Sequence, residues 1–223
     1  LFADITGSTA LTESLDAEDA HDRLYGAVQQ MCEAIEAERG TVCLFMGDGV
    51  MAMFGAPLSY EDHAARACAA ALTLQARMSE YADALERQHG CRVEARVGLH
   101  SGEVVVLQVG SADKAEYDAS GASVPLAARM EQSAQPGTIQ LSASTFALVE
   151  SHFEGEALPP VTVKGFDDPV PVVRLLRRRA LSVVSMTVPF VGRRAELEQM
   201  RALFDACARA RSGRCVVIGG EPG

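Results

Sequence analysis

Apolar residues recur at helical spacing over Asp16–Arg39 and over Glu61–His89, and both stretches predict long amphipathic helices. Glycines Gly40 and Gly90 directly follow them, as is typical of helix C-termini. Between the helices, two almost wholly apolar runs flank Gly47-Asp48-Gly49. This pattern predicts a β-hairpin with one carboxylate at its tip, and such apolar strands are expected to be covered on both faces.

Three further stretches have the period of a strand. The chain opens on apolar residues that run into Asp4 and a tight turn, with a helical pattern from about Ala10. Cys91–Leu99 alternates apolar and polar positions, and after a turn at Ser101-Gly102 the stretch Glu103–Val109 is expected to be its return strand. The element order predicts an α+β fold, with helices packed against a mainly antiparallel sheet.

The two acids at strand ends are the first candidate chemistry. Asp4 ends a buried strand and can hold a hard divalent cation, while the amides of the turn Thr6–Thr9 face an anion. The alternative for Asp4 is an ordinary helix cap, and for Asp48 a plain Asp-Gly hairpin turn. If the two strands are neighbours, the carboxylates form a two-metal site suited to displacement at phosphorus.

Five sequence blocks, in order, resemble the class III adenylate and guanylate cyclase catalytic domain. The blocks are Phe2–Thr9, Met46–Gly55, Glu61–Ala67, Arg96–Val106 and Val124–Met130. The resemblance covers residues 1–176 and implies a ferredoxin-like βαβ core. It also implies conversion of ATP to 3′,5′-cyclic AMP and pyrophosphate, with two Mg²⁺ or Mn²⁺ ions per site, one of which lowers the pKa of the attacking ribose oxygen.

The resemblance assigns a role to each matching residue. Metal binding is implied for Asp4, Ile5 and Asp48, and substrate binding for Thr6, Gly7, Ser8, Thr9, Asp118 and Lys164. Within this set Asp118 reads the adenine and Lys164 contacts the triphosphate, and Arg129 is expected to stabilise the transition state. In the family each site lies at a head-to-tail dimer interface, so a homodimer, or a heterodimer with a second cyclase domain, is expected.

Two positions depart from the family pattern. Leu44 stands where a base-reading Lys is expected, and leaving one polar edge of the base unmatched costs about 1–3 kcal/mol. Pro125 stands where a ribose-steadying Asn is expected, and losing one positioned donor costs roughly 10²–10³ in rate. Asp118 argues against specificity for GTP, but the absence of a base-reading Lys at Leu44 leaves that specificity open. The alternative function is therefore a degenerate cyclase-like domain that regulates an attached ATPase or only dimerises.

Bulk properties narrow the class of partners. The net charge of −10 over 223 residues argues against a nucleic-acid-binding role. No run of eighteen apolar residues is present, so no membrane span is expected in this stretch. Six cysteines stand singly without Cys-x-x-Cys pairs, which favours reduced thiols in a cytoplasmic protein without zinc.

The character of the chain changes after Leu176. Residues 177–188 are expected to be a linker, and residues 189–223 resemble the beginning of a P-loop ATPase domain: an amphipathic helix through Ala210, a strand from Arg214 to Ile218, and then Gly220-Glu221-Pro222-Gly223. That glycine run would be the first half of a phosphate-binding loop, without its lysine. We expect the chain to be part of a longer, multidomain protein.

Overall fold

A computed structural model describes residues 1–109, 116–163, 168–180, 193–210, 213 and 215–217. The chain divides into two compact units, Leu1–Leu181 and Ser182–Gly223, and each is described by itself. Within the described residues no helix is long and apolar enough to cross a membrane.

The first unit is built on a mainly antiparallel sheet. Its seven described strands are β1 (Phe2–Thr6), β2 (Thr41–Met46), β3 (Gly49–Met53), β4 (Glu94–Leu99), β7 (Ile139–Ser142), β8 (Phe153–Val161) and β9 (Val170–Arg178). They lie in the order β2-β3-β1-β4-β7-β9-β8, and only the β4–β7 pair is parallel. Strand β1 is thus central, between β3 and β4, so residues from three separate parts of the chain meet around Asp4.

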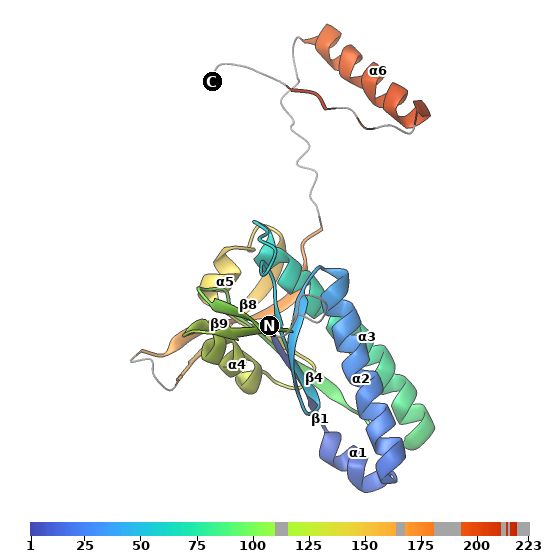
Figure 1. Ribbon diagram of the computed structural model, residues 1–223, viewed down its shortest axis with the longest axis vertical. Helices are drawn as coiled ribbons and strands as arrows, with labels where there is room; N and C mark the ends of the chain where they lie inside the picture. The colour runs from blue at the N-terminus through green and yellow to red at the C-terminus, as the bar shows by residue number, and fades with distance from the viewer. Residues whose placement is uncertain (110–115, 164–167, 181–192, 211–212, 214, 218–223) are drawn as a thin grey trace. The chain divides into compact units, whose positions relative to one another are not determined.

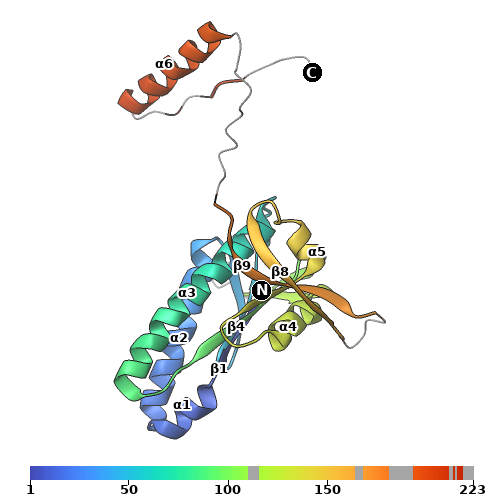
Figure 2. The ribbon, with the colours of Figure 1, turned by 180° about the vertical axis from the view of Figure 1, so that it is seen from behind.

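Helices cover both faces of this sheet (Figures 1 and 2). The helices are α1 (Ser8–Ser14), α2 (Ala17–Ala37), α3 (His63–His89), α4 (Ser123–Ser133) and α5 (Ala143–Ala147). Alternate residues of β1, including Ala3 and Ile5, join the main apolar core with α2 and α3. Phe2 packs on the opposite face, with Met51 and Ala127 of α4. Asp4, which shares that face with Phe2, is therefore on the α4 side of the sheet.

The predicted α+β fold with helices flanking a mainly antiparallel sheet is confirmed. Helices α2 and α3 form as expected from the apolar period, and Asp16 caps α2 by accepting a hydrogen bond from Asp19 N at 2.9 Å. Gly90 ends α3 in the left-handed conformation, with φ of 71°. Strands β2 and β3 form the predicted hairpin around Gly47 and Asp48.

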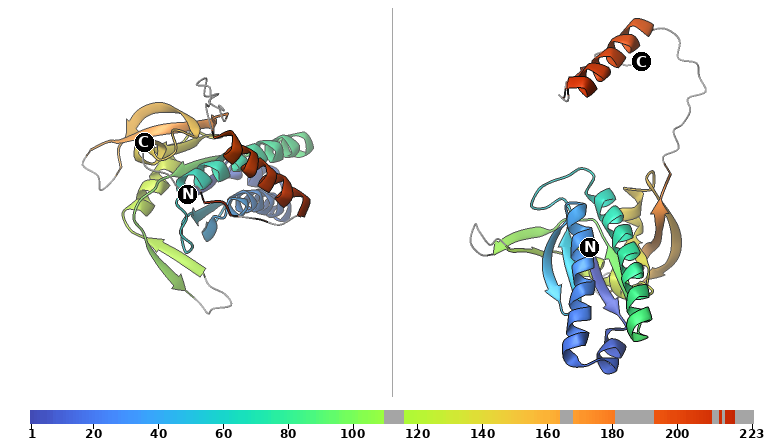
Figure 3. Two further views of the ribbon diagram at one scale, coloured as in Figure 1. Left: turned by 90° about the horizontal axis from the view of Figure 1, so that it is seen from above. Right: turned by 90° about the vertical axis from the view of Figure 1, so that its right-hand side faces the viewer.

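The expected return strand after Ser101-Gly102 does not pair as predicted. Strand β5 (Val105–Val109) forms a separate two-stranded sheet with β6 (Glu116–Ser120) rather than returning along β4. This pair projects from the rest of the first unit (Figure 3). Both edges of β4 are already occupied, by β1 and by β7, so no edge is left for β5 to join.

The expectation that both hairpin strands are covered on both faces is wrong for β2. Strand β3 is buried throughout, but β2 is the edge of the sheet, and Phe45 at its end is 62% exposed. Leu44 and Met46 are also exposed. Apolar composition thus predicted the strand correctly but not its position in the sheet.

In the second unit α6 (Arg194–Ala210) forms where the amphipathic pattern predicted a helix. The strand expected from Arg214 to Ile218 is wrong for its described part, Cys215–Val217, which has no strand conformation. A strand requires a hydrogen-bonded neighbour, and none is described in this unit. The expected linker over residues 177–188 is wrong at its beginning, because Arg177 and Arg178 end strand β9 and pair with β8. The expected glycine-rich loop and residues 181–188 of the expected linker lie outside the described residues.

Candidate functional site

Asp4 lies between two neighbouring strands and presents one carboxylate oxygen to each. Its Oδ2 accepts a hydrogen bond from Arg96 Nη2 of β4 at 2.9 Å. Its Oδ1 lies over Gly49 of β3, 2.9 Å from the position that a Cβ would occupy there. Gly49 is the cross-strand partner of Asp4. The absence of a side chain at Gly49 thus makes room for the carboxylate on the side of the hairpin.

Asp48 lies in the hairpin turn directly before Gly49, which is the cross-strand partner of Asp4. Asp48 and Gly47 also line a cavity of about 750 Å³, and Ser8 and Thr9 are among its other lining residues. The hairpin tip and the turn that the sequence singled out as an anion site therefore face the same cavity.

The turn from Thr6 to Thr9 connects β1 to α1. Gly7 has a φ of 86°, a left-handed conformation that suits glycine, and a Cβ there would lie 3.0 Å from the Arg92 carbonyl oxygen. Thr6 Oγ1 donates to the Glu94 carbonyl oxygen at 3.1 Å, so its hydroxyl is engaged with β4. Ser8 and Thr9 are the first two residues of α1, where backbone amides have no hydrogen-bond acceptor within the helix.

The donor set fits a hard divalent cation. No group of three or more His, Cys, Asp or Glu side chains that could hold a metal ion occurs in the part of the chain that the structure describes. Mg²⁺ is commonly bound by only one or two carboxylates, with waters and substrate phosphates completing its shell. Asp4 and Asp48 match that pattern, and Ile5 can offer only its backbone carbonyl oxygen.

The residues expected to bind the base and ribose lie on β6 and α4. Asp118 is exposed, and its Oδ1 accepts from Ala119 N at 2.8 Å. It lies near Cys43 of β2, whose pKa is raised by burial and, to a smaller extent, by Asp118. Arg129 is exposed on α4. Lys164 lies outside the described residues.

The two departures from the expected pattern also have clear positions. Leu44 follows Cys43 on the edge strand β2 and is exposed. Pro125 is the third residue of α4. A proline is tolerated there because the amides of a first helical turn have no intrahelical acceptor. Pro125 is therefore compatible with the fold whatever its effect on catalysis.

The two sets of candidate residues lie at different parts of the β2–β3 hairpin. Asp118 lies near Cys43, the third residue of β2, whereas Asp48 lies in the turn beyond the end of β2. Asp48 shares a cavity with Ser8 and Thr9, and Asp118 is not among the residues that line it.

Sequence reasoning gave no role to Arg96 and Glu131. Arg96 is the cross-strand partner of Asp4, and its Nη2 also lies 3.1 Å from Glu131 Oε1 of α4. Burial raises the pKa of the Glu131 carboxyl, Arg96 opposes that rise, and Asp4 adds to it. The signal available in the sequence was the charged Arg96 between the apolar residues Ala95 and Val97 of a strand.

The first unit matches a known protein family in sequence and in fold. The model of the adenylate and guanylate cyclase catalytic domain matches residues 1–175. The chain belongs to this family. The cyclase fold is shared with the adenylyl cyclase CyaB from P. aeruginosa, at a TM-score of 0.74 and 29% identity, over 80% of this chain and 92% of that one. The guanylyl cyclase Cya2 gives a TM-score of 0.73 and 30% identity, over 82% and 92% of the two chains.

Curated relatives include adenylate cyclases. Adenylate cyclase 1 of Rhizobium meliloti is 32% identical over 131 residues, which are 59% of this chain and 20% of the relative. An adenylate cyclase of Mycobacterium bovis is 33% identical over 168 residues, 74% of this chain and 36% of the relative. The chain thus spans about a third or less of these cyclases. Adenylyl and guanylyl cyclases match at nearly equal identity, so overall similarity does not distinguish the two nucleotides.

Proposed function

We propose that this cyclase domain converts ATP to 3′,5′-cyclic AMP and pyrophosphate at a site shared by two chains arranged head to tail. The observation that carries the proposal is the placement of Asp4 on β1 with its Oδ1 over Gly49, the first residue of the neighbouring strand β3, while Asp48 directly precedes Gly49 and lines one cavity with Ser8 and Thr9. In the reaction the ribose O3′ bonds to the α-phosphorus. The bond from that phosphorus to the bridging oxygen breaks, pyrophosphate leaves, and the hydroxyl proton passes to solvent.

Asp4 and Asp48, with the Ile5 carbonyl oxygen, would hold two Mg²⁺ or Mn²⁺ ions. When bound, such ions supply charge neutralisation at phosphate oxygens and lower the pKa of a coordinated hydroxyl. The amides at Ser8 and Thr9 orient the phosphate chain at the start of α1. Thr6 fixes the turn through its hydrogen bond to β4.

Asp118, Arg129 and Lys164 would come from the partner chain. Asp118 can accept a hydrogen bond from the adenine amino group, which guanine lacks at that position, and this favours ATP. Arg129 is exposed and free to meet charge that develops on the phosphate. Because Leu44 cannot hydrogen-bond to a base, we propose that selection of ATP over GTP is weak.

Two features of the single chain support a shared site. Asp48 lines a cavity together with Ser8 and Thr9, and Asp118 on β6 is not among the residues that line it. Apolar side chains are also exposed on β2 and β5, including Phe45 and Val105 at 62% and 60%. Exposed apolar surface of this kind is typical of protein interfaces.

We propose a cytoplasmic location, which the six free cysteines support. We also propose the order of parts expected from the sequence, with the first boundary moved to the end of β9: a cyclase domain through Arg178, then a linker to residue 188, and the start of a P-loop ATPase over 189–223. Helix α6 is compatible with that last part, since it forms where an amphipathic helix was expected at the start of the ATPase.

The test is formation of cyclic AMP from ATP with Mn²⁺, at protein concentrations that drive dimerisation, for the wild type and the Asp4→Ala variant. We expect product from the wild type and none from the variant. A second candidate is a degenerate domain that binds nucleotide and regulates an attached ATPase, favoured by Leu44 and Pro125. Nucleotide binding without product in the wild type would support that candidate instead.

A further inference from the structure

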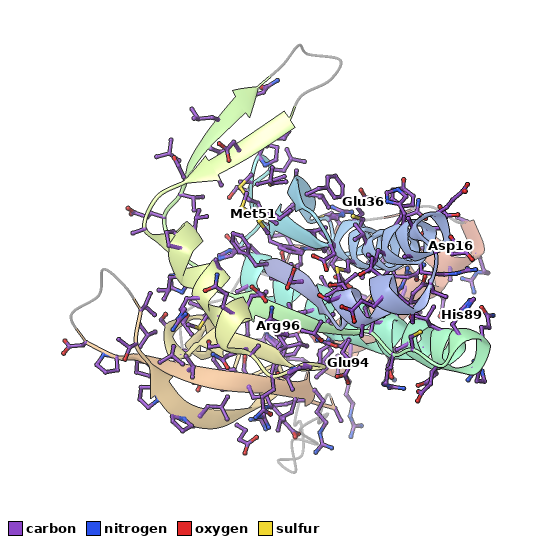
Figure 4. The ribbon with its side chains drawn as sticks, turned by 90° about the horizontal axis from the view of Figure 1, so that it is seen from below. Asp16, Glu36, Met51, His89, Glu94 and Arg96 are labelled. Carbon is purple, nitrogen blue, oxygen red and sulfur yellow. The ribbon has the colours of Figure 1, made fainter. Side chains whose placement is uncertain are left out.

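The cation site is tied to helix α4 through one guanidinium. Arg96 Nη2 lies 2.9 Å from Asp4 Oδ2 on β1 and 3.1 Å from Glu131 Oε1 on α4. Arg96 projects from β4 toward the face that α4 covers (Figure 4). A single arginine nitrogen is therefore shared by two carboxylates, of which Asp4 is the proposed metal ligand.

Glu131 is a charged residue in a buried position. It is 7% exposed, and it is the only charged residue that is buried in the part of the chain that the structure describes. Helix α4 lies very close to β4 there. A Cβ at Gly98 of β4 would collide with Glu131 N and with the Ala127 carbonyl oxygen of α4, so the close approach requires glycine at this position. Replacing a buried ion pair by apolar side chains is often neutral or stabilising, so packing alone does not account for Glu131 and Arg96.

The shared guanidinium is incompletely satisfied. Arg96 Nε and Glu131 Oε1 are both buried without a hydrogen-bond partner among the described residues. The 3.1 Å contact of Glu131 Oε1 with Arg96 is therefore an ionic contact rather than a hydrogen bond. A small shift of Arg96 toward Glu131 would improve the pairing of both groups, at the expense of the contact with Asp4.

We propose that Glu131 is a positioning residue for the cation site: it takes over Arg96 when Asp4 turns toward a divalent cation. In the metal-free protein Arg96 neutralises Asp4 and holds it in place. A cation at Asp4 competes with the guanidinium, and Glu131 lowers the cost of that competition by retaining the arginine. This inference rests on the proposed function, because it takes Asp4 to be a metal ligand.

The proposal predicts the direction in which Mn²⁺ affinity changes in variants of Glu131 and Arg96, and a purely structural role of Glu131 does not. With Glu131→Gln, Asp4 is the sole anionic partner of Arg96, so the cation must displace a more firmly held guanidinium. Mn²⁺ affinity should fall about tenfold, because one neighbouring charge changes the proton affinity of a carboxylate by about tenfold or more, and we expect a similar effect on cation affinity. The double variant Arg96→Met/Glu131→Gln removes the competitor, and Mn²⁺ affinity should return to the wild-type value or exceed it.

The experiment titrates Mn²⁺ alone into the full chain and counts free Mn²⁺ by electron paramagnetic resonance, with circular dichroism to verify folding. Glu154→Gln is the matched control, because Glu154 pairs with Arg177 at 2.8 Å elsewhere on the sheet. This control should bind Mn²⁺ as the wild type does. If Glu131→Gln does not fold, Glu131→Asp replaces it, since it keeps the charge but shortens the reach to Arg96, and it should also weaken binding.

Three outcomes would overturn the inference. If Glu131→Gln binds Mn²⁺ as tightly as the wild type while Asp4→Ala does not bind, the inference fails and the proposed function stands. If the double variant is as weak as Glu131→Gln, Glu131 acts only through packing. If Asp4→Ala retains wild-type Mn²⁺ binding, the metal role of Asp4 fails, and the inference fails with it.

Discussion

Replacing Gly49 by alanine tests the contact on which the cation site depends. A Cβ at this position would lie 2.9 Å from the Ala3 carbonyl oxygen and 2.9 Å from Asp4 Oδ1, about 0.5 Å closer than ordinary contact begins. The carbonyl oxygen belongs to a strand hydrogen-bonded on both sides, so it cannot move independently. The Asp4 carboxylate can rotate and is expected to give way.

Two effects of different size follow from this geometry. Overpacking costs about 1–3 kcal/mol of unfolding free energy, and the loss of glycine freedom in the unfolded chain offsets about 0.4–1 kcal/mol of it. Each remaining kcal/mol lowers Tm by about 2–4 °C in a domain of this size. Displacing the ligand oxygen should weaken Mn²⁺ binding about 10–100-fold, the range found for groups that orient metal ligands.

The assay combines thermal unfolding with Mn²⁺ titration of Gly49→Ala, Asp4→Ala and the double variant. Gly213→Ala is the control, because no atom lies within 4 Å of the added methyl group. If Gly49→Ala acts by displacing Asp4, the double variant binds Mn²⁺ no more weakly than Asp4→Ala. A folded Gly49→Ala protein with wild-type Mn²⁺ affinity would refute the reasoning.

Three further predictions concern other parts of the first unit. Asp48→Asn should abolish Mn²⁺-dependent cyclic AMP formation while leaving Tm within a few degrees, because a turn acid contributes little packing; unfolding of this variant would count against its metal role. Pro125→Asn should raise kcat by up to about 10²–10³ with unchanged Tm, and unaltered turnover would show that no donor is missing there. Burial lowers the pKa of His100 from its ordinary value of 6.5, so the stability it contributes is present above pH 6.5 and is lost as pH falls through the folded pKa. His100→Gln should therefore lose less Tm than the wild type between pH 7 and pH 5, whereas a matched change at the exposed His21 should not alter that loss.

Local signals in the sequence were sufficient for much of the fold. The ends of α2 and α3 follow from the apolar period together with Asp16 and Gly90, because helix formation depends on residues three and four positions apart. The hairpin around Asp48 follows from two apolar runs and a glycine-flanked turn, since tight turns are formed by adjacent residues. Asp48 could therefore be identified as the acid of a hairpin turn from the sequence. The expectation that Asp4 ends its strand is wrong, because Asp4 is the third residue of β1 (Phe2–Thr6) and has a cross-strand partner on each side.

The position of each strand in the sheet could not be predicted in the same way. The apolar composition of β2 gave no indication that it is an edge strand with exposed Phe45, and β5 pairs with β6 although it follows β4. Strand pairing depends on hydrogen bonds between residues far apart in the chain, and the apolar period of a strand does not specify its neighbour.

The sequence by itself determined the helices, the hairpin and the two carboxylates, because each depends on residues close together in the chain. Only the tertiary structure placed Gly49 under Asp4 and joined Arg96 to both Asp4 and Glu131. Those contacts link residues that are between 35 and 92 positions apart. The register of β1 against β3 and β4 sets the two contacts of Asp4, and the packing of α4 on β4 sets the contact of Arg96 with Glu131. Charges at such separations come together only when the sheet forms and α4 packs against it.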